Sequence, residues 1–207
     1  MDRIFKGGAW LCSMLLLASC GASVAVGTGA VVTRTVLEER STKDALQDAE
    51  IRLSLNNRFL NHSTELFGDI STSVVEGRVV LTGSVPRRED KIDATKIAWS
   101  TPGVGIVTDE LTVKEDSGAI DYVNDAWISN QLRLGLLTDT NVSSVNYTVE
   151  TVDKVVHLTG IARSRTELGR VIDSAAGIPG VARVVSHVLT IDDPRRQVTS
   201  AEQSTTG

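Results

Sequence analysis

The residue best placed for chemistry is Cys20, which ends the stretch Leu17-Ala18-Ser19-Cys20. Arg3 and Lys6 precede an apolar run over residues 9–18 that is too short to span a bilayer as a mature helix. Such a run, followed by a large apolar residue, two small residues and a cysteine, is typical of a bacterial lipoprotein signal. We therefore predict cleavage before Cys20 and attachment of acyl chains such as palmitate to it. The alternative is an ordinary secretory signal in which this cysteine falls by chance.

The other candidates for chemistry form no catalytic pattern. The three histidines, His62, His157 and His187, are scattered without the spacing of paired metal ligands, and His157 is expected on a strand surface. The chain has no serine-hydrolase, zinc-protease or phosphate-loop motif, and Cys12 falls inside the predicted signal. We therefore expect a protein that is not an enzyme and that uses no cofactor and no metal.

Composition restricts the classes of partner. Apolar residues make up 41% of the chain and charged residues 23%, which is ordinary for a globular protein with a core. The net charge of −5 disfavours nucleic acid, because phosphate binding needs a basic surface. It also disfavours simple electrostatic attachment to anionic lipid, so any lipid contact by the folded part must be local and partly apolar. With a single cysteine after the signal, no intrachain disulfide is expected.

The chain contains a long internal repeat. Leu81-Thr82-Gly83 recurs as Leu158-Thr159-Gly160, an offset of 158 − 81 = 77 residues. The register needs no gap until the last strand, where Leu111-Thr112-Val113 meets Leu189-Thr190-Ile191 at 189 − 111 = 78. That difference predicts one extra residue in the second copy. We interpret the chain as a tandem duplication.

Each copy predicts a helix, a β-hairpin, a second helix and a last strand. The expected ranges are 44–60, 69–75, 78–84, 87–100 and 104–113 in the first copy, and 121–137, 145–152, 154–161, 164–176 and 181–191 in the second. In the first helix, the shared apolar pairs 46/123, 49/126, 55/132 and 59/136 predict one buried stripe, and Trp99 of the second helix is expected in the core. The fold class is α+β: two tandem small αββαβ domains, each a mixed three-stranded sheet with two helices on one face.

The predicted organisation follows from these elements and from the composition of the ends. Residues after Asp192 show no apolar period, which is typical of a disordered segment. The expected parts are a signal peptide over 1–19, a lipidated cysteine and flexible tether over 20–42, a first domain over 43–115, a second domain over 119–192 and a disordered tail over 193–207.

The strand and turn residues resemble those of the BON-domain family. The first copy carries Gly77-x-Val79-x-Leu81-x-Gly83, a helix, and then Pro102-Gly103-Val104 before the last strand. The second copy departs from this pattern where Lys154 replaces the first glycine. A lipoprotein signal with two such domains resembles the dual BON-domain outer-membrane lipoproteins. The resemblance implies a periplasm-facing protein that binds anionic phospholipid through its second BON domain, supports outer-membrane integrity and is enriched at the cell division site. Glycine rather than aspartate after Cys20 also favours the outer membrane.

Positions that are apolar in only one of the two copies are candidates for a specialised surface. Trp127 replaces Glu50 and Leu134 replaces Asn57, seven residues apart and therefore on one helical face. A helix that binds at a lipid interface typically buries an exposed tryptophan and a neighbouring aliphatic residue there. Ile161, expected in a loop, stands where the first copy has Ser84, and Arg163, Arg165 and Arg170 offer a local positive rim. The predicted phospholipid-binding residues are Trp127, Asn130, Arg133, Leu134 and Ile161.

Other interpretations of the same residues stay open at this point. Trp127 could instead pack in the core or between the two copies, as most single tryptophans do. The same face could dock an outer-membrane or division-site envelope protein, or the cleft between the copies could hold a ligand. Dependence on the lipid headgroup separates the first interpretation from the others.

Overall fold

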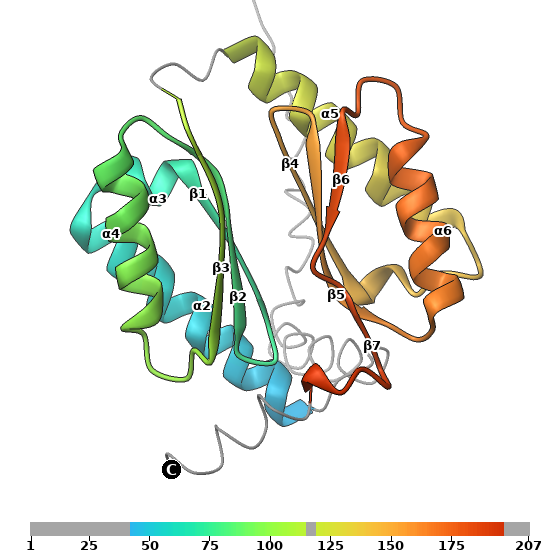
Figure 1. The fold of residues 1–207 in the computed structure, drawn as a ribbon, viewed down its shortest axis with the longest axis horizontal. Coiled ribbons are helices and arrows are strands. Elements are labelled where there is room, and N and C mark those ends of the chain that lie inside the picture. Colours follow the sequence, from blue (N-terminus) through green and yellow to red (C-terminus); the bar gives the residue numbers. More distant parts are fainter. Residues whose placement is uncertain (1–41, 115–118, 197–207) are drawn as a thin grey trace, which may run out of the picture.

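The computed structural model describes residues 42–114 and 119–196, and in them the duplication appears as two domains of the same build (Figure 1). The first domain contains α2 (Thr42–His62), α3 (Thr64–Asp69), β1 (Ile70–Val75), β2 (Arg78–Val85), α4 (Arg88–Trp99) and β3 (Ile106–Val113). The second contains α5 (Ala119–Thr138), the 3-10 turn η1 (Ser144–Asn146), β4 (Tyr147–Val152), β5 (Val155–Ala162), α6 (Arg165–Ala176), β6 (Arg183–Ser186) and β7 (Leu189–Thr190). The predicted signal, Cys20 and most of the tether lie outside the described residues.

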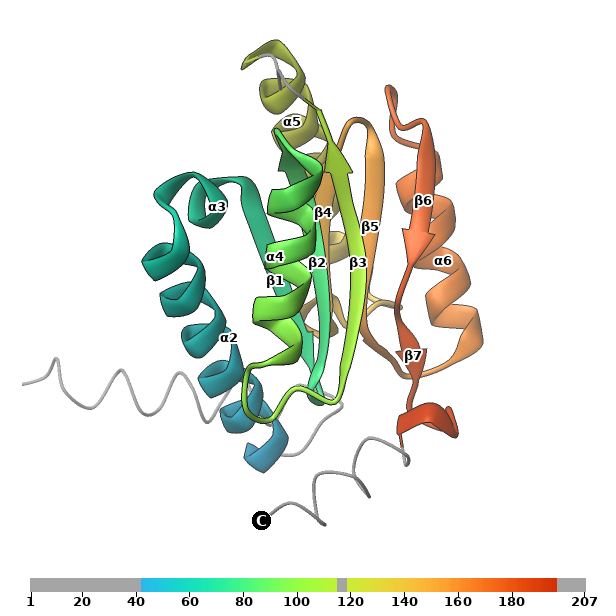
Figure 2. The same ribbon diagram turned by 60° about the vertical axis from the view of Figure 1, so that its left-hand side comes forward.

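Each domain is a mixed sheet with its long helices on one face, as predicted. In the first sheet, β2 is central, antiparallel to β1 and parallel to β3. In the second sheet, β5 takes the same place between β4 and a broken last strand made of β6 and β7. Figure 2 shows α2 and α4 together on the outer side of the first sheet.

The buried face of each first helix differs in part from the predicted stripe. Leu55 and Phe59 of α2, and Leu132 and Leu136 of α5, are buried in two separate cores as expected. Leu46 and Val123 were predicted to be buried but are 58% and 65% exposed. The prediction failed because being apolar in both copies does not prove burial.

Trp99 was also predicted to lie in the core, and this is wrong. Ala94 and Ala98 carry the buried face of α4, whereas Trp99 is 54% exposed. Successive helical residues are turned by about 100°, so the residue after Ala98 points away from the sheet.

A buried aspartate in each first helix holds the hairpin turn of its domain. Asp48 accepts hydrogen bonds from the backbone N–H groups of Glu76 and Gly77 at 2.8 and 2.9 Å. Asp125 accepts the corresponding bonds from Asp153 and Lys154 at 2.7 and 2.9 Å. Carboxylate bonds to backbone N–H groups are among the stronger hydrogen bonds in proteins. They tie each helix to a turn 28 to 29 residues away.

The last strand of the second domain keeps the offset of 77, so the predicted extra residue is wrong. Ser84 pairs with Thr112 and Ile161 pairs with Leu189 (161 − 84 = 77; 189 − 112 = 77). The offset of 78 matched Leu189 with Leu111, which packs in the first core, whereas Leu189 lies outside the second core. A shift of one residue exchanges the two faces of a strand. The similar triplets Leu-Thr-Val and Leu-Thr-Ile concealed that shift.

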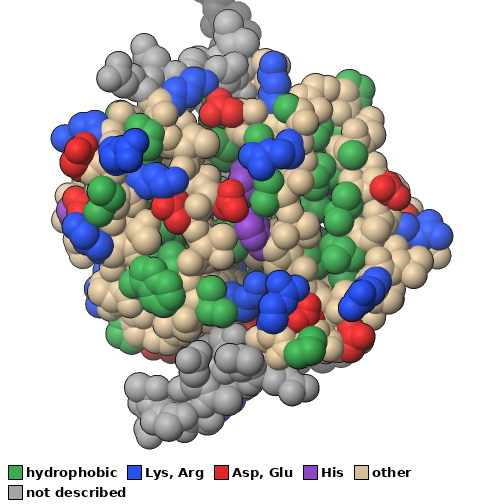
Figure 3. All heavy atoms as spheres, viewed as in Figure 1, with side chains coloured by type: hydrophobic (Ala, Val, Ile, Leu, Met, Phe, Trp, Pro, Cys, Tyr) green, Lys and Arg blue, Asp and Glu red, His purple; other side chains and the backbone are tan. Residues whose placement is uncertain are grey.

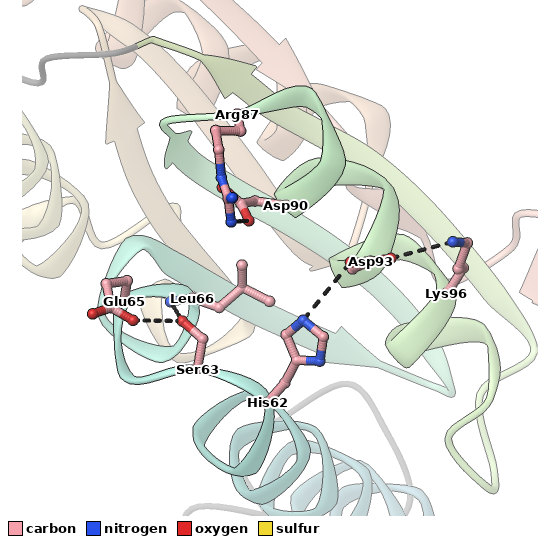
Figure 4. Close-up of polar contacts among 8 residues, drawn as sticks. All are labelled: His62, Ser63, Glu65, Leu66, Arg87, Asp90, Asp93 and Lys96. Carbon is pink, nitrogen blue, oxygen red and sulfur yellow. Dashed lines mark hydrogen bonds and ion pairs between the residues drawn. The ribbon is translucent and has the colours of Figure 1, made fainter.

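The short helix α3 was not predicted. Ser63 caps it, because its Oγ accepts a hydrogen bond from the N–H of Leu66 at 3.0 Å, and the side chain of Leu66 is buried. Figure 4 shows this cap beside His62, whose Nε2 lies 3.8 Å from an oxygen of Asp93 on α4. His62 therefore lies on the outer, helical side of the first domain.

The two sheets face each other, and the helices lie outside them (Figure 1). Contacts join β1 to β5 and β2 to β4. Side chains alternate along β2 and β5, so Val80 and Thr159 point away from their own helices, yet both are buried. Each sheet therefore covers the face that the other leaves open.

Reciprocal ion pairs close the two ends of this interface. Lys114, which follows β3, lies 2.8 Å from Asp153 in the β4–β5 turn. Arg196, after β7, lies 2.7 Å from Glu76 in the β1–β2 turn. Residues 193–196 were predicted to begin a disordered tail, but the Arg196 contact holds them against the first domain. In the described part of the chain, no helix is both long and apolar enough to cross a membrane.

The turn that holds Lys154 gives a stability prediction. Lys154 has φ 64°, a left-handed conformation, where the first domain has Gly77 at φ 69°. A side chain in this region costs about 1 kcal/mol or more. We expect Lys154→Gly to raise the free energy of unfolding by about 1 kcal/mol and Gly77→Lys to lower it, both measured by equilibrium urea unfolding. A loss of stability in Lys154→Gly would contradict the strain.

Candidate functional site

The outer face of α5 carries an exposed stripe that is apolar except for Asn130. Val123, Trp127, Asn130, Leu134 and Leu137 follow one another at spacings of four and three residues, so they share one side of the helix. The exposed fractions are 65% for Val123, 47% for Trp127, 58% for Leu134 and 69% for Leu137, and Asn130 is also exposed. The opposite side of α5 packs into the second core. The stripe is neutral and has no charged member.

The first domain carries a related but interrupted stripe on α2. Leu46, Leu53 and Leu60 are 58%, 63% and 46% exposed at the equivalent places. Between them stand Glu50 and Asn57, which the second copy replaces with Trp127 and Leu134. The comparison of copies therefore found the two added members correctly. It missed Val123 and Leu137, because residues shared with the first copy were assigned to the core.

Arg133 lies next to Asn130 of the α5 stripe, but its side chain is bonded to the sheet that α5 covers. Its guanidinium donates to the carbonyl oxygen of Val149 and lies 3.6 Å from Glu150 Oε1. Burial raises the pKa of Glu150, and the nearby Arg133 opposes that rise. Because its guanidinium already contacts Val149 and Glu150, Arg133 is less able to bind the phosphate group of a lipid.

A groove of about 390 Å³ runs between the inner edge of α5 and the first domain. Tyr122, Asn130 and Arg133 line it from α5, and Asp69 and Ser84 line it from the first domain. Tyr122 of α5 is 76% exposed. The groove gives the α5 surface a polar border on the side of the first domain.

Ile161 does not join the surface, so this predicted site residue is wrong. It lies within β5 rather than in a loop, is 3% exposed, and pairs with Leu189 of β7. Both side chains lie outside the second core and on the side of β5 that faces the first sheet. The replacement of Ser84 by Ile161 in the second copy therefore adds a buried side chain to the interface between the domains.

The predicted arginine rim is only partly available. Arg163 donates to Glu167 at 2.9 Å and to the carbonyl oxygen of Asn141 at 3.3 Å. Arg165 and Arg170 are exposed on α6. Arg163 bonds to Asn141, and hydrogen bonds from Asn141 and the nearby charge of Arg170 both lower the pKa of Asp139, so these two arginines lie near the C-terminal end of α5. Arg165 lies near Asp192 instead.

The histidines are arranged differently from the sequence expectation. His157 was expected on a strand surface but is 4% exposed between the two sheets. His187 lies next to it, with nearly parallel rings whose centroids are 6.5 Å apart. Their separation of thirty positions in the sequence (187 − 157 = 30) left no local spacing that could have revealed the pair.

Comparison with known proteins matches both domains. The model of the BON domain family matches residues 47–115 and 124–191. A protein of Anaplasma centrale named as an uncharacterized protein in the gshII 5' region is 35% identical over 144 residues, which cover 69% of this chain and 94% of that relative.

Two relatives have more descriptive names. The outer membrane lipoprotein DolP of Haemophilus influenzae is 27% identical over 179 residues, covering 86% of this chain and 92% of that one. The osmotically-inducible protein Y of Escherichia coli is 28% identical over 147 residues, covering 70% of this chain and 73% of that one.

Replacing second-copy residues by their first-copy counterparts tests which of them are on the surface. We expect Leu134→Asn to change the free energy of unfolding by no more than about 0.5 kcal/mol, because Leu134 faces solvent. Ile161→Ser should lower it by about 2 kcal/mol or more, because it removes a side chain buried between the sheets. Urea unfolding of the two variants measures both, and equal losses would mean that the α5 stripe is packed.

Proposed function

This chain belongs to the BON-domain family, and from that premise we propose that it is a lipid-anchored, periplasm-facing protein of the outer membrane. In this proposal, Cys20 holds the chain at the bilayer and the outer stripe of α5 contacts anionic phospholipid. The role is non-enzymatic support of outer-membrane integrity. The observation that carries the lipid contact is the exposed neutral stripe that contains Trp127 and Leu134.

The cellular location rests on a relative and on the sequence. The Haemophilus influenzae protein, named as an outer membrane lipoprotein, aligns over 86% of this chain. The lipoprotein pattern around Cys20 accounts for the anchor by itself. Each acyl CH₂ buried in a membrane contributes about 0.8 kcal/mol, so more than one chain makes the attachment effectively permanent.

A weak helix contact suits an anchored protein. Full burial of a large apolar side chain contributes roughly 1.5–3 kcal/mol, and residues such as Trp127 and Leu134 have about half of that surface left to bury. A tether holds the domain near the membrane at an effective concentration of about millimolar. At that concentration, a binding free energy of about −4 kcal/mol gives half occupancy of the contact. A contact near half occupancy responds to lipid composition. The anchor would keep the protein at the membrane while α5 senses the lipid.

The charge distribution supports a contact that is mainly apolar. The net charge of −5 opposes anionic lipid at long range, and the stripe itself carries no charge. Each arginine near a membrane surface contributes about 1 kcal/mol. Arg165 and Arg170 are exposed on α6, while Arg133 and Arg163 are already paired. The preference for anionic lipid is therefore expected to be modest and to weaken in salt.

A vesicle-binding experiment tests the proposal. The chain 42–196 lacks Cys20, contains both domains, and retains Trp99 and Trp127 as its tryptophans. In a Trp99→Phe background, the fluorescence of Trp127 should shift to the blue with vesicles that contain phosphatidylglycerol, and less with phosphatidylcholine alone. Sedimentation with vesicles should then be lost in Trp127→Glu.

Trp99 provides the matched control. It is 54% exposed on α4, against 47% for Trp127 on α5, so Trp99→Glu removes a similar exposed tryptophan from the other domain. We expect this variant to bind vesicles like the wild type. If the wild type ignores vesicles, the lipid proposal fails, and docking of an envelope protein on the stripe becomes the hypothesis to test. If Trp127→Glu still binds, the contact lies elsewhere, and the groove beside α5 is the next candidate.

A further inference from the structure

Three metal-binding side chains meet between the two sheets. His157 lies on β5, His187 lies between β6 and β7, and Glu110 lies on β3 of the other domain. One nitrogen from each histidine and one carboxylate oxygen all lie within 4.8 Å of one another. Figure 3 shows histidine side chains in the seam between the domains, with acidic and basic groups next to them.

Each histidine has a buried ring nitrogen that lacks a hydrogen bond. Among the described residues, Nδ1 of His157 and Nε2 of His187 have no hydrogen-bond partner. Nε2 of His187 lies 3.2 Å from Glu110 Oε1, a distance at which only a protonated imidazole forms an ion pair, and the two atoms lack the alignment of a hydrogen bond. A buried polar atom without a partner is costly, and a bound ion or water is a common reason for one.

The protonation state also suits metal binding. Burial lowers the pKa of His157 and of His187, although Glu110 acts in the opposite direction on both. A lowered pKa favours the neutral imidazole, which is the form that binds metals.

We propose that Glu110, His157 and His187 form a binding site for a zinc-type divalent transition metal that bridges the two BON domains. Two histidines and a carboxylate, with a fourth position left open, are a known zinc ligand set. Zinc bonds of about 2.0–2.1 Å place two tetrahedral ligands about 3.4 Å apart. Glu110 and His187 already have this separation, and His157 needs to move inward by no more than about 1.4 Å. Because the two imidazole rings are nearly parallel, one of them must also turn so that both nitrogens point at the same ion.

The duplication does not produce a second such site among the described residues. His187 stands at the position equivalent to Glu110 (187 − 110 = 77), so the two residues meet across the interface from corresponding places. The counterpart of His157 is Val80, which is 3% exposed and has no donor atom. A second set of ligands is therefore not generated by the repeat.

Two arginines limit the expected affinity. Arg183 acts on His157 and Arg78 acts on His187, each lowering the pKa of that histidine by its positive charge. The same charges oppose a dication, while Glu110 favours it. We therefore expect weaker binding than at structural zinc sites with four protein ligands.

Zinc titration of the full chain in detergent tests the site. Cys12 and Cys20 are also potential ligands, so both are first replaced by serine. After treatment with a chelator, calorimetric titration with zinc chloride should give one equivalent bound and raise the midpoint of thermal unfolding. His157→Val should lose both effects, and it should still fold because valine occupies the equivalent place in the first domain.

Two further variants complete the test. Glu110→Gln should also lose the bound equivalent, which a site within the second domain alone would not. His62→Gln, a change at the exposed histidine on α2, should bind zinc like the parent chain. No zinc binding by the parent, or equal binding by His157→Val, would overturn the proposal. The titration contains no vesicles, so its result is independent of the lipid contact.

Discussion

Each domain has a sheet with helices on only one side, and the structure depends on how the other side is covered. A small three-stranded sheet left open would expose apolar and unpaired polar groups to solvent. Here the two open faces cover each other, burying Val80 from one sheet and Thr159 and Ile161 from the other. The duplication supplies two faces of similar shape. The ion pairs Lys114–Asp153 and Arg196–Glu76 close the interface from equivalent turns.

This arrangement turns the first helices outward. Because α2 and α5 cover the outer faces of the sheets, their distal sides remain in solvent in both domains. An exposed stripe on α5 is therefore a consequence of the way the sheets pair. What the second copy adds is apolar character at Trp127 and Leu134, where the first copy has Glu50 and Asn57. The first domain can then keep the interface while the second one acquires a contact surface.

The divergence between the copies serves two different surfaces. Trp127 and Leu134 change the outside of the molecule, whereas His157 and Ile161 change its inside, between the sheets. Equivalent positions of the two copies can also carry different residues that contact each other, as Glu110 and His187 do. Tandem copies of one fold can thus build a site that neither copy holds alone. Outer and inner changes are separable, because they lie on opposite sides of the second sheet and its helix.

The sequence alone determined the duplication, the order of the long helices and the strands, the α+β fold and the residues that distinguish the α5 stripe. These follow from local spacing and from comparison at one offset, which need no knowledge of distant contacts. Only the tertiary structure decided which apolar residues are buried. Leu46 and Trp99 are exposed and Ile161 is buried, since burial depends on which strand or helix face another element covers.

The register of the last strand and the meeting of His157, His187 and Glu110 were likewise decided by tertiary structure. Two nearly identical triplets made an offset of 78 look correct, and only pairing with β5 placed Leu189 on the inner face. His157 and His187 lie thirty positions apart, and Glu110 belongs to the other domain, so no local spacing predicts their contact. The three side chains meet only because the two sheets pack face to face.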